Sequence, residues 1–413
     1  MSTSVLTCRL CRAPLSHPVI DLGTTPLANA YVRPEHAERP EPHYPLRAYL
    51  CGTCLLLQLE AVAAPEAIFG HYAYFSSYSK TLLRHSEQFA DAIVARLGLT
   101  KGARMIEIAS NDGYLLQFFQ RKGLDVLGVE PARNIAAAAV AKGIPTVSRF
   151  LNAEVAAEIA LERGKAVLVV ANNVMAHVPD LNDFLAGLKI LLAPGGMATI
   201  EFHHALRLVE GVQFDNIYHE HFQYFSLASA EHALGAHGMT VVDAEEVPTQ
   251  GGSIRVYAVH DDDIGAKPSA RVRELRDQES AAGLGRADTY RALGERIAQI
   301  KLALLSFLVS AKQQGKHVVC FGAAAKGNTL LNYCGVHADL VDYAVDSSPH
   351  KQGLLLPGSR IPVHPPSRVM DTKPDYVLIL PWNLTDEITA QMDGVRAWGG
   401  QFVVAVPELR VLR

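Results

Sequence analysis

RMIEIASNDGYLLQFFQRKGLDVLGVE, residues 104–130, contains the parts of an α/β nucleotide-binding unit in consecutive order. The short apolar run 105–108 predicts a buried strand. The polar turn after it ends at Gly113, a residue that tolerates unusual backbone angles. Residues 114–122 predict a helix, and a second apolar run then ends on Glu130. Such a strand–turn–helix–strand unit places a nucleoside over the carboxyl ends of parallel strands, with an acidic residue available for its ribose hydroxyls.

This unit lacks the G-x-G-x-x-G fingerprint of dinucleotide-binding domains. An acidic residue near the end of the first strand, a small polar turn and a second acidic residue about twenty positions later resemble the S-adenosylmethionine site of class I methyltransferases. That ligand carries no phosphate, so a glycine-rich phosphate cradle is not needed. The alternative is another nucleotide-binding Rossmann domain. The residues that the resemblance assigns to the cofactor are Glu107, Ala109, Asn111, Asp112, Gly113, Glu130 and Asn172.

Length and composition limit the classes of protein that this chain can form. With 413 residues, 49% of them hydrophobic and 19% charged, we expect two or three globular domains. A formal charge of −4 disfavours nonspecific binding to nucleic acid or to acidic membranes. No apolar run is long enough to cross a bilayer, and the N-terminus has no signal-peptide pattern, so we expect a cytoplasmic protein.

Four of the six cysteines form two C-x-x-C pairs near the N-terminus: Cys8, Cys11, Cys51 and Cys54. In a reducing compartment this spacing favours metal over disulfides. Two such knuckles suit a closed tetrahedral zinc site, which leaves no open coordination position for a substrate. We therefore expect structural zinc that stabilises a small segment lacking a core of its own. The proline-rich stretch between the pairs is expected to be irregular.

Polar side chains gather after two of the predicted strands and in one loop. The strand 166–170 is followed by His177, at the strand end that faces the ligand crevice in an open α/β sheet; a structural capping role is the alternative. Residues 214–226 contain the densest polar cluster, with Tyr218, His219, Glu220 and His221 among aromatic rings. Such density indicates acid–base chemistry, because burial and neighbouring charges move pKa values towards neutrality. The loop 71–79, which contains Tyr74, is either a packed connector or a lid that faces the substrate. Residues 80–97 after it predict an amphipathic helix.

The last third of the chain predicts a second α/β unit. A strand at 317–321 precedes Gly-Ala-Ala-Ala-Lys-Gly-Asn, residues 322–328, and a helix. Further strands are predicted at 340–345, 376–380 and 402–406. Small residues and Lys326 at a helix N-terminus are able to hold a phosphate or pyrophosphate, and Asn328 is placed with Lys326 as a substrate contact. The alternative is a Rossmann-like duplicate used only for packing.

These motifs, in this order, resemble one family. The paired cysteine knuckles, E-I-A-S-N-D-G, I-Y-H-E-H-F and G-A-A-A-K-G are similar to those of three-domain sugar C-methyltransferases that act on nucleotide-linked 4-keto-deoxysugars. The resemblance implies an α/β protein with a zinc-binding N-terminal domain, a central class I methyltransferase domain and a C-terminal Rossmann-like domain. The boundaries that we expect are 1–80, 81–262 and 263–413, with the nucleotide sugar held by the last domain.

The resemblance also assigns the chemistry. The active-site positions of the family fall on Tyr74, His177, Tyr218, Glu220 and His221. As a hypothesis, His221 removes the C3 proton next to the ketone, Glu220 orients it, and the tyrosines donate to the enolate oxygen. The segment Glu201–His204 has no clear counterpart, and His219 stands where some members have an acid. Whether His203, His204 or His219 contacts substrate stays open.

Other classes of function fit parts of this pattern. A zinc-containing RNA methyltransferase would need a basic face and, for amino-group methylation, an N/D-P-P-Y/F motif, neither of which is evident. An O- or N-methyltransferase of another small metabolite would need no ketone. A non-catalytic nucleotide-sugar binding protein would not need the crowded segment 218–221. As partners we expect a small nucleotide-sugar substrate, no nucleic acid, no membrane and at most a weak homodimer.

Overall fold

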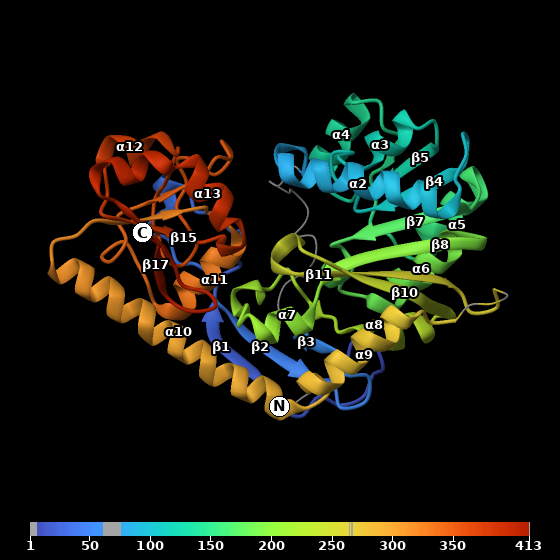
Figure 1. Ribbon diagram of the computed structural model, residues 1–413, viewed down its shortest axis with the longest axis horizontal. Coiled ribbons are helices and arrows are strands. Elements are labelled where there is room, and N and C mark those ends of the chain that lie inside the picture. The colour runs from blue at the N-terminus through green and yellow to red at the C-terminus, as the bar shows by residue number, and fades with distance from the viewer. Residues whose placement is uncertain (1–5, 61–75, 264, 266, 413) are drawn as a thin grey trace. The chain divides into compact units, whose positions relative to one another are not determined.

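The computed structural model describes residues 6–60, 76–263, 265 and 267–412, and the chain forms two compact units (Figure 1). Each unit is assembled from three separate stretches of the sequence. Unit 1 consists of Met1–Leu15, Cys51–His204 and Phe222–Ala282. Unit 2 consists of Ser16–Leu50, Ala205–His221 and Gly283–Arg413.

Unit 1 contains a seven-stranded sheet in the order β10-β11-β8-β7-β4-β5-β6. The five strands from β8 to β6 are parallel, whereas β10 and β11 form an antiparallel hairpin at one edge. The strands are β4 (Arg104–Ile108), β5 (Asp125–Val129), β6 (Thr146–Val147), β7 (Ala166–Asn172), β8 (Leu192–His203), β10 (Met239–Val247) and β11 (Ser253–His260). The central strands are buried on both faces, which explains why β4 and β7 read as nearly continuous apolar runs.

Helices cover the sheet of unit 1. They are α2 (Lys80–Leu97), α3 (Leu116–Arg121), α4 (Arg133–Ala141), α5 (Ala153–Arg163), α6 (Leu181–Leu191), α8 (Leu227–Gly235) and α9 (Ala270–Ala282). One apolar core joins α2, α3 and α4 to the strands, with Phe89, Phe119 and Leu168 among its buried members. Helix α2 has the predicted bounds because the Ser79 hydroxyl accepts the Leu82 N–H at its start and Gly98 ends it with a φ of 58°.

A short antiparallel pair in unit 1, β3 (Leu57–Leu59) with β9 (Gln223–Tyr224), joins segments that are distant in sequence. Three single 3-10 turns complete the unit: η2 (Ser76–Tyr78), η3 (Met175–His177) and η5 (Thr249–Gly251). Turn η3 directly follows β7, so it places His177 at the carboxyl end of the parallel sheet.

Unit 2 contains a six-stranded sheet in the order β14-β13-β12-β15-β16-β17, parallel except for its last strand. Its strands are β12 (Val318–Phe321), β13 (Ala344–Val345), β14 (Val363–His364), β15 (Tyr376–Ile379), β16 (Gln401–Val404) and β17 (Arg410–Leu412). Its helices are α7 (Ala205–Glu210), α10 (Ala287–Gln313), α11 (Ala325–Cys334), α12 (Ser367–Thr372) and α13 (Thr385–Gln391). The remaining turns are η1 (Pro34–His36), η4 (Phe214–Asn216), η6 (Trp382–Leu384) and η7 (Asp393–Trp398).

The expectation that the stretch between the cysteine pairs is irregular is wrong. It contains the antiparallel hairpin of β1 (Ile20–Thr25) and β2 (Tyr44–Leu50). The prolines do not prevent these strands from forming, because most lie outside them and Pro45 lies near the start of β2.

Two other predicted elements have different bounds in the structure. Helix α3 begins at Leu116 rather than Tyr114, because Tyr114 and Leu115 still belong to the turn in which Asn111 and Gly113 have positive φ values of 49° and 78°. Strand β13 contains only two residues, and the predicted strand residues 340–343 before it are not part of a strand.

Candidate active site

The turn between β4 and α3 is shaped by three left-handed residues. Ala109, Asn111 and Gly113 have φ values of 54°, 49° and 78°. A side chain at Gly113 would not fit, because a Cβ there would lie 2.8 Å from the Ile144 side chain. This unusual backbone path is held by hydrogen bonds, not by regular secondary structure.

Glu130 anchors that turn from the end of β5. One carboxylate oxygen accepts the Asn111 N–H at 3.0 Å, and the other accepts the Ala132 N–H at 2.8 Å. The Asn111 side-chain oxygen in turn accepts the Ser76 N–H at 2.9 Å. Burial raises the pKa of Glu130, while the two backbone hydrogen bonds lower it. A carboxylate has about four acceptor positions, so Glu130 keeps capacity for ligand hydroxyls.

The strand ends and the turn of this sheet contain buried acceptor atoms that lack a partner in the described part of the chain. Both carboxyl oxygens of Glu107 belong to this set, as do Asp112 Oδ1 and Asn172 Oδ1. Burial raises the pKa of Glu107 well above its ordinary value, and the neighbouring charges of Glu130 and Asp112 raise it further. Buried acceptors normally have donors. The site therefore suits a ligand with hydroxyl or ammonium donors and positive charge, and S-adenosylmethionine has all three.

A second set of polar groups lies in unit 2, directly after η4. His221 Nδ1 lies 2.8 Å from the carbonyl oxygen of Asn216, and His221 Nε2 lies 2.8 Å from the Tyr218 hydroxyl. A carbonyl oxygen only accepts, so Nδ1 carries the hydrogen. In the neutral ring Nε2 is then the basic nitrogen, which accepts the Tyr218 O–H. The arrangement supplies a histidine base of defined tautomer, paired with a phenol.

Glu220 lies in the same segment and is almost fully buried. Its carboxylate accepts a hydrogen bond from the Asn29 side chain at 2.7 Å. Burial raises the pKa of Glu220 to about 7, although the Asn29 hydrogen bond and the positive charge of Lys351 act in the opposite direction. A carboxyl group that titrates near neutrality can hold or release a proton at working pH.

Two other histidines named from the sequence, His219 and His204, are bound to protein groups. His219 Nε2 lies 3.0 Å from the Pro45 carbonyl oxygen. His204 is fully buried, with Nε2 at 2.7 Å from a carboxylate oxygen of Glu279. Glu279 also accepts the backbone N–H groups that begin α8, including that of Ala228 at 3.1 Å. These contacts favour structural roles for both histidines.

The other two predicted catalytic residues are His177 and Tyr74. His177 lies at the end of η3 in unit 1 and is half-buried. Tyr74 lies outside the described residues.

The predicted substrate contacts lie at the N-terminus of α11 in unit 2. Lys326 is buried, its ammonium group donates to Asn383 Oδ1 at 2.9 Å, and it lies 4.8 Å from the centre of the Trp382 ring. Asn328 donates to the Ala28 carbonyl at 2.6 Å. Its own side-chain oxygen is buried without a partner among the described residues.

The four N-terminal cysteines converge in unit 1. Their sulfur atoms all lie within 4.8 Å of one another, with Cys8 and Cys54 3.5 Å apart and Cys11 and Cys51 also 3.5 Å apart. Four thiolates around tetrahedral zinc, each about 2.3 Å from the metal, require sulfur separations of about 3.8 Å. Gln58 Nε2, 3.1 Å from Cys8 Sγ, adds an outer hydrogen bond to this cluster. The residues thus fit structural zinc.

Comparison with known proteins agrees with this architecture. Family models match three consecutive regions: a zinc binding domain at residues 8–69, a methyltransferase domain at 82–244, and a C-methyltransferase C-terminal domain at 248–407. The C-methyltransferase NovU of Streptomyces niveus is 36% identical over 406 residues, which is 98% of this chain and 96% of NovU. The chain belongs to the C-methyltransferase family.

Other similarities cover only part of the chain. A ubiquinone biosynthesis O-methyltransferase of Bradyrhizobium sp. is 33% identical over 105 residues, which is 25% of this chain and 41% of that protein. The crystal structure of magnesium protoporphyrin IX methyltransferase from Synechocystis with bound S-adenosylmethionine is 16% identical, with a TM-score of 0.35, over 49% of this chain and all of that protein.

As a member of this family, the protein is an S-adenosylmethionine-dependent C-methyltransferase with a zinc-binding segment. The predictions of an α/β fold, of the methyl donor and of zinc are confirmed. In the described part of the chain, no helix combines the length and the apolar character required of a membrane span.

Sequence reasoning missed a buried ionic network in unit 1. Glu201, at the carboxyl end of β8, lies 2.5 Å from Arg255 and 3.5 Å from His85. Burial alone would raise the pKa of Glu201, but the hydrogen bond from His85 and the charge of Arg255 lower it to about 2. Glu201 was noted in the sequence, but its partners are distant in the chain, and no local pattern indicated the pairing.

A second missed group is in unit 2. Asp215 is fully buried, and one of its carboxylate oxygens accepts the Trp382 indole N–H at 2.7 Å. Burial raises the pKa of Asp215 to about 6, against the charge of Lys326 and the Trp382 hydrogen bond. Its position in the dense polar segment 214–226 was the one signal in the sequence.

Proposed function

We propose that this enzyme methylates C3 of a nucleotide-linked 4-keto-deoxysugar through an enolate. The pairing of His221 with Tyr218 carries this proposal, because it provides a base of defined tautomer beside a hydroxyl donor. Membership of a C-methyltransferase family adds that the methyl acceptor is carbon. Carbon becomes a nucleophile most easily next to a carbonyl group, which acidifies the neighbouring C–H bonds.

In the proposed reaction, His221 Nε2 takes the proton from the carbon beside the ketone. The Tyr218 hydroxyl, displaced from Nε2 by that proton, then donates to the developing enolate oxygen. Glu220 orients the substrate or the base, with Asn29 fixing its carboxyl group. Tyr74 and His177 complete the predicted set, as a second hydroxyl donor and as a polar group at the end of β7.

The methyl donor would be held by Glu107, Ala109, Asn111, Asp112, Gly113, Glu130 and Asn172. Glu130 would accept the ribose hydroxyls, and the acidic groups would face the positive part of the ligand. S-adenosylmethionine supplies an electrophilic methyl group on a sulfonium ion. The carbon nucleophile attacks that methyl carbon, the carbon–sulfur bond breaks, and S-adenosylhomocysteine leaves. Transfer of this kind depends mainly on alignment of the two reactants.

The nucleotide part of the substrate would use the first turn of unit 2. Lys326 supplies a buried cation and Asn328 a buried amide at the N-terminus of α11. A helix N-terminus with a cation suits a diphosphate.

Deuterium uptake at the sugar tests the central step. The enzyme is incubated in heavy water with the thymidine or uridine diphosphate form of 4-keto-6-deoxyglucose, with and without S-adenosylmethionine. We expect enzyme-dependent deuterium at C3 by NMR, and a methyl group at C3 when the donor is present. His221→Asn should abolish both while leaving S-adenosylmethionine affinity nearly unchanged. Exchange and methylation at C5, the other neighbour of the ketone, would overturn the C3 assignment. Methylation without His221-dependent exchange would overturn the proposed base.

A further inference from the structure

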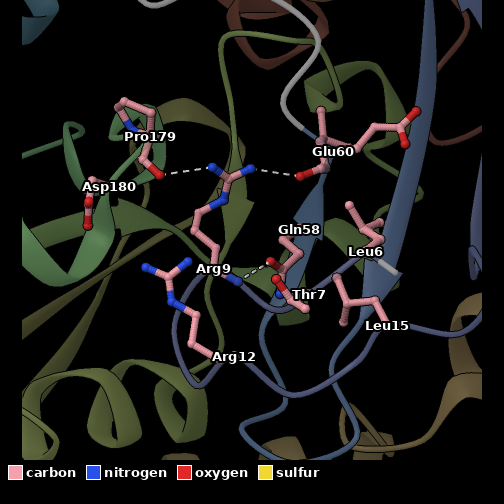
Figure 2. A pocket seen from close by; sticks show the side chains of 10 residues that line it. Leu6, Thr7, Arg9, Arg12, Leu15, Gln58, Glu60, Pro179 and Asp180 are labelled. Carbon is pink, nitrogen blue, oxygen red and sulfur yellow. Dashed lines mark hydrogen bonds between the residues drawn. The ribbon is translucent and has the colours of Figure 1, made fainter. Parts of the chain in front are cut away.

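The side chain of Arg9 joins the zinc knuckle, residues 8–11, to the His177 loop, residues 173–180. Arg9 lies between Cys8 and Cys11, and its guanidinium group spans two backbone carbonyls (Figure 2). It donates to the Pro179 carbonyl at 2.9 Å and to the Leu59 carbonyl at 2.8 Å. Pro179 is two residues after His177, so the arginine holds the chain just after the turn η3.

The backbone of the knuckle is fastened to the same region. The Arg9 N–H donates to the Gln58 side chain at 2.8 Å, and Gln58 also lies 3.1 Å from Cys8 Sγ. The Asn182 side chain donates to the carbonyls of Arg9 and Leu10 at 3.1 and 3.0 Å. The zinc ligands and the loop after β7 are thus connected through several hydrogen bonds that converge on Arg9.

Other contacts hold the middle of the His177 loop, whereas Arg9 holds Pro179 near its end. Gln223 donates to the carbonyls of Met175 and Val178 at 2.7 and 2.9 Å. The Phe222 N–H donates to the Ala176 carbonyl at 2.8 Å, and the guanidinium carbon of Arg9 lies 5.0 Å from the centre of the Phe222 ring. Arg9 therefore contacts both the His177 loop and Phe222, a residue that donates a hydrogen bond to that loop.

We infer that Arg9 is a positioning residue for methyl transfer, through which the zinc knuckle sets the place of His177. Arg9 and Pro179 both line a pocket of about 200 Å³. Zinc would then have a role beyond stabilising a small segment. By holding the backbone on both sides of Arg9, it would fix the position of the guanidinium group that contacts the His177 loop. This inference rests on the catalytic role proposed for His177.

Arg12 provides a matched control within the same knuckle. It lines the same pocket and carries the same charge, but it is exposed and carries none of the hydrogen bonds drawn in Figure 2. Arg9→Met and Arg12→Met remove the same charge and keep similar volume. Arg9→Lys keeps the charge but can no longer bridge two carbonyls with a planar group.

The experiment is a double-mutant cycle between Arg9→Met and His177→Asn, with Arg9→Lys and Arg12→Met beside it. Methyl transfer is measured with S-adenosylmethionine and the thymidine diphosphate form of 4-keto-6-deoxyglucose, and zinc content and S-adenosylmethionine affinity are measured for each variant. A displaced catalytic group costs about 10- to 100-fold in rate. We expect Arg9→Met to lower kcat by that factor with little change in KM, zinc content or affinity for the donor.

Non-additivity distinguishes positioning from general destabilisation. In the His177→Asn background, Arg9→Met should cause little further loss, because both changes act on one group. Arg9→Lys should recover part of kcat, and Arg12→Met should match the wild type. The inference would be overturned if the loss of kcat in the double mutant equalled the product of the two single-mutant losses. A loss of kcat that runs in parallel with loss of zinc would overturn it too. A fully active His177→Asn single variant would instead overturn the proposed role of His177. The cycle distinguishes this result from one that contradicts only the positioning role of Arg9.

Discussion

The two Rossmann-type turns of this protein share one backbone frame and differ in their charges. In unit 1 the Ala109 N–H donates to the Val129 carbonyl at 2.7 Å, and in unit 2 the Gly322 N–H donates to the Val345 carbonyl at 2.7 Å. The acidic residue that directly follows each of these valines has the same task in both units. Glu130 accepts the Asn111 N–H, and Asp346 accepts the Ala323 N–H at 2.8 Å.

The side chains on this frame are not alike. Strand register makes Cys320 the counterpart of Glu107, since these residues pair with Ala344 and Gly128, two positions before the respective acids. Unit 1 therefore has an excess of buried carboxyl groups at its turn, whereas unit 2 has a buried lysine, Lys326. The comparison teaches that the fold supplies an anchored turn, and that the surrounding charges select the ligand.

Exchanging the two anchoring acids for amides should give the largest difference between the units. Glu130→Gln should weaken S-adenosylmethionine binding about 100-fold, because each hydrogen bond to a charged group contributes about 1.5–3 kcal/mol. Asp346→Asn makes the same change in unit 2 and should leave the affinity for S-adenosylmethionine within about twofold of the wild-type value. Such a change corresponds to less free energy than a single neutral hydrogen bond contributes. Calorimetric titration measures both, and equal losses in the two variants would contradict the division of ligands.

The buried cation of unit 2 should act on the other substrate. Lys326→Met should raise KM for the nucleotide sugar about tenfold, which is the smallest effect expected when a hydrogen bond to a charged group is lost. The affinity for S-adenosylmethionine should not change. Lys312→Met, an exposed lysine of α10, is the control. Steady-state kinetics with each substrate varied in turn would decide the matter, and an unchanged sugar KM would remove Lys326 from the proposed site.

The Glu107 carboxyl group should lower the free energy of unfolding of the protein without bound S-adenosylmethionine. Its pKa is raised by burial and by nearby acids, so its contribution to stability is greatest below the ordinary value of 4.5 and is lost as pH rises. Glu107→Gln should therefore raise the free energy of unfolding at neutral pH by about 1 kcal/mol while weakening donor binding. Urea unfolding at several pH values measures the first effect. Cys320→Ser, at the equivalent position, should not flatten the pH dependence.

The smallest effect is a spectroscopic one in unit 2. Both tryptophans of the chain, Trp382 and Trp398, belong to this unit. Because Trp382 donates to Asp215, whose pKa burial raises to about 6, its fluorescence should change with a midpoint near that pH. Trp398 donates to the Pro374 carbonyl, which does not titrate. The transition should survive Trp398→Phe and vanish in Asp215→Asn; its persistence in the latter would assign it to another group.

Local patterns predicted the anchored turn of unit 1 because all its parts lie within 27 residues. The apolar run, the turn and Glu130 are close in the chain, and the C-x-x-C spacing identifies zinc ligands without further information. The bounds of α2 were also predicted correctly, since a serine cap and a glycine end mark them.

Contacts between distant residues could not be predicted in this way. Asn29 and Glu220 are 191 positions apart, Arg9 and Pro179 are 170 apart, and Trp382 and Asp215 are 167 apart. No periodicity or spacing encodes such pairs, and the hairpin β1–β2 was missed because its prolines resemble those of a loop.

The sequence alone determined the class of fold, the zinc ligands and the presence of acidic residues on both sides of the first turn, because local propensity and short-range spacing are enough to define them. Tertiary structure decided the tautomer of His221, the raised pKa of Glu220 and the contacts of Arg9. Each of these depends on a carbonyl oxygen, on burial or on a neighbouring charge that the folded chain brings from a distance.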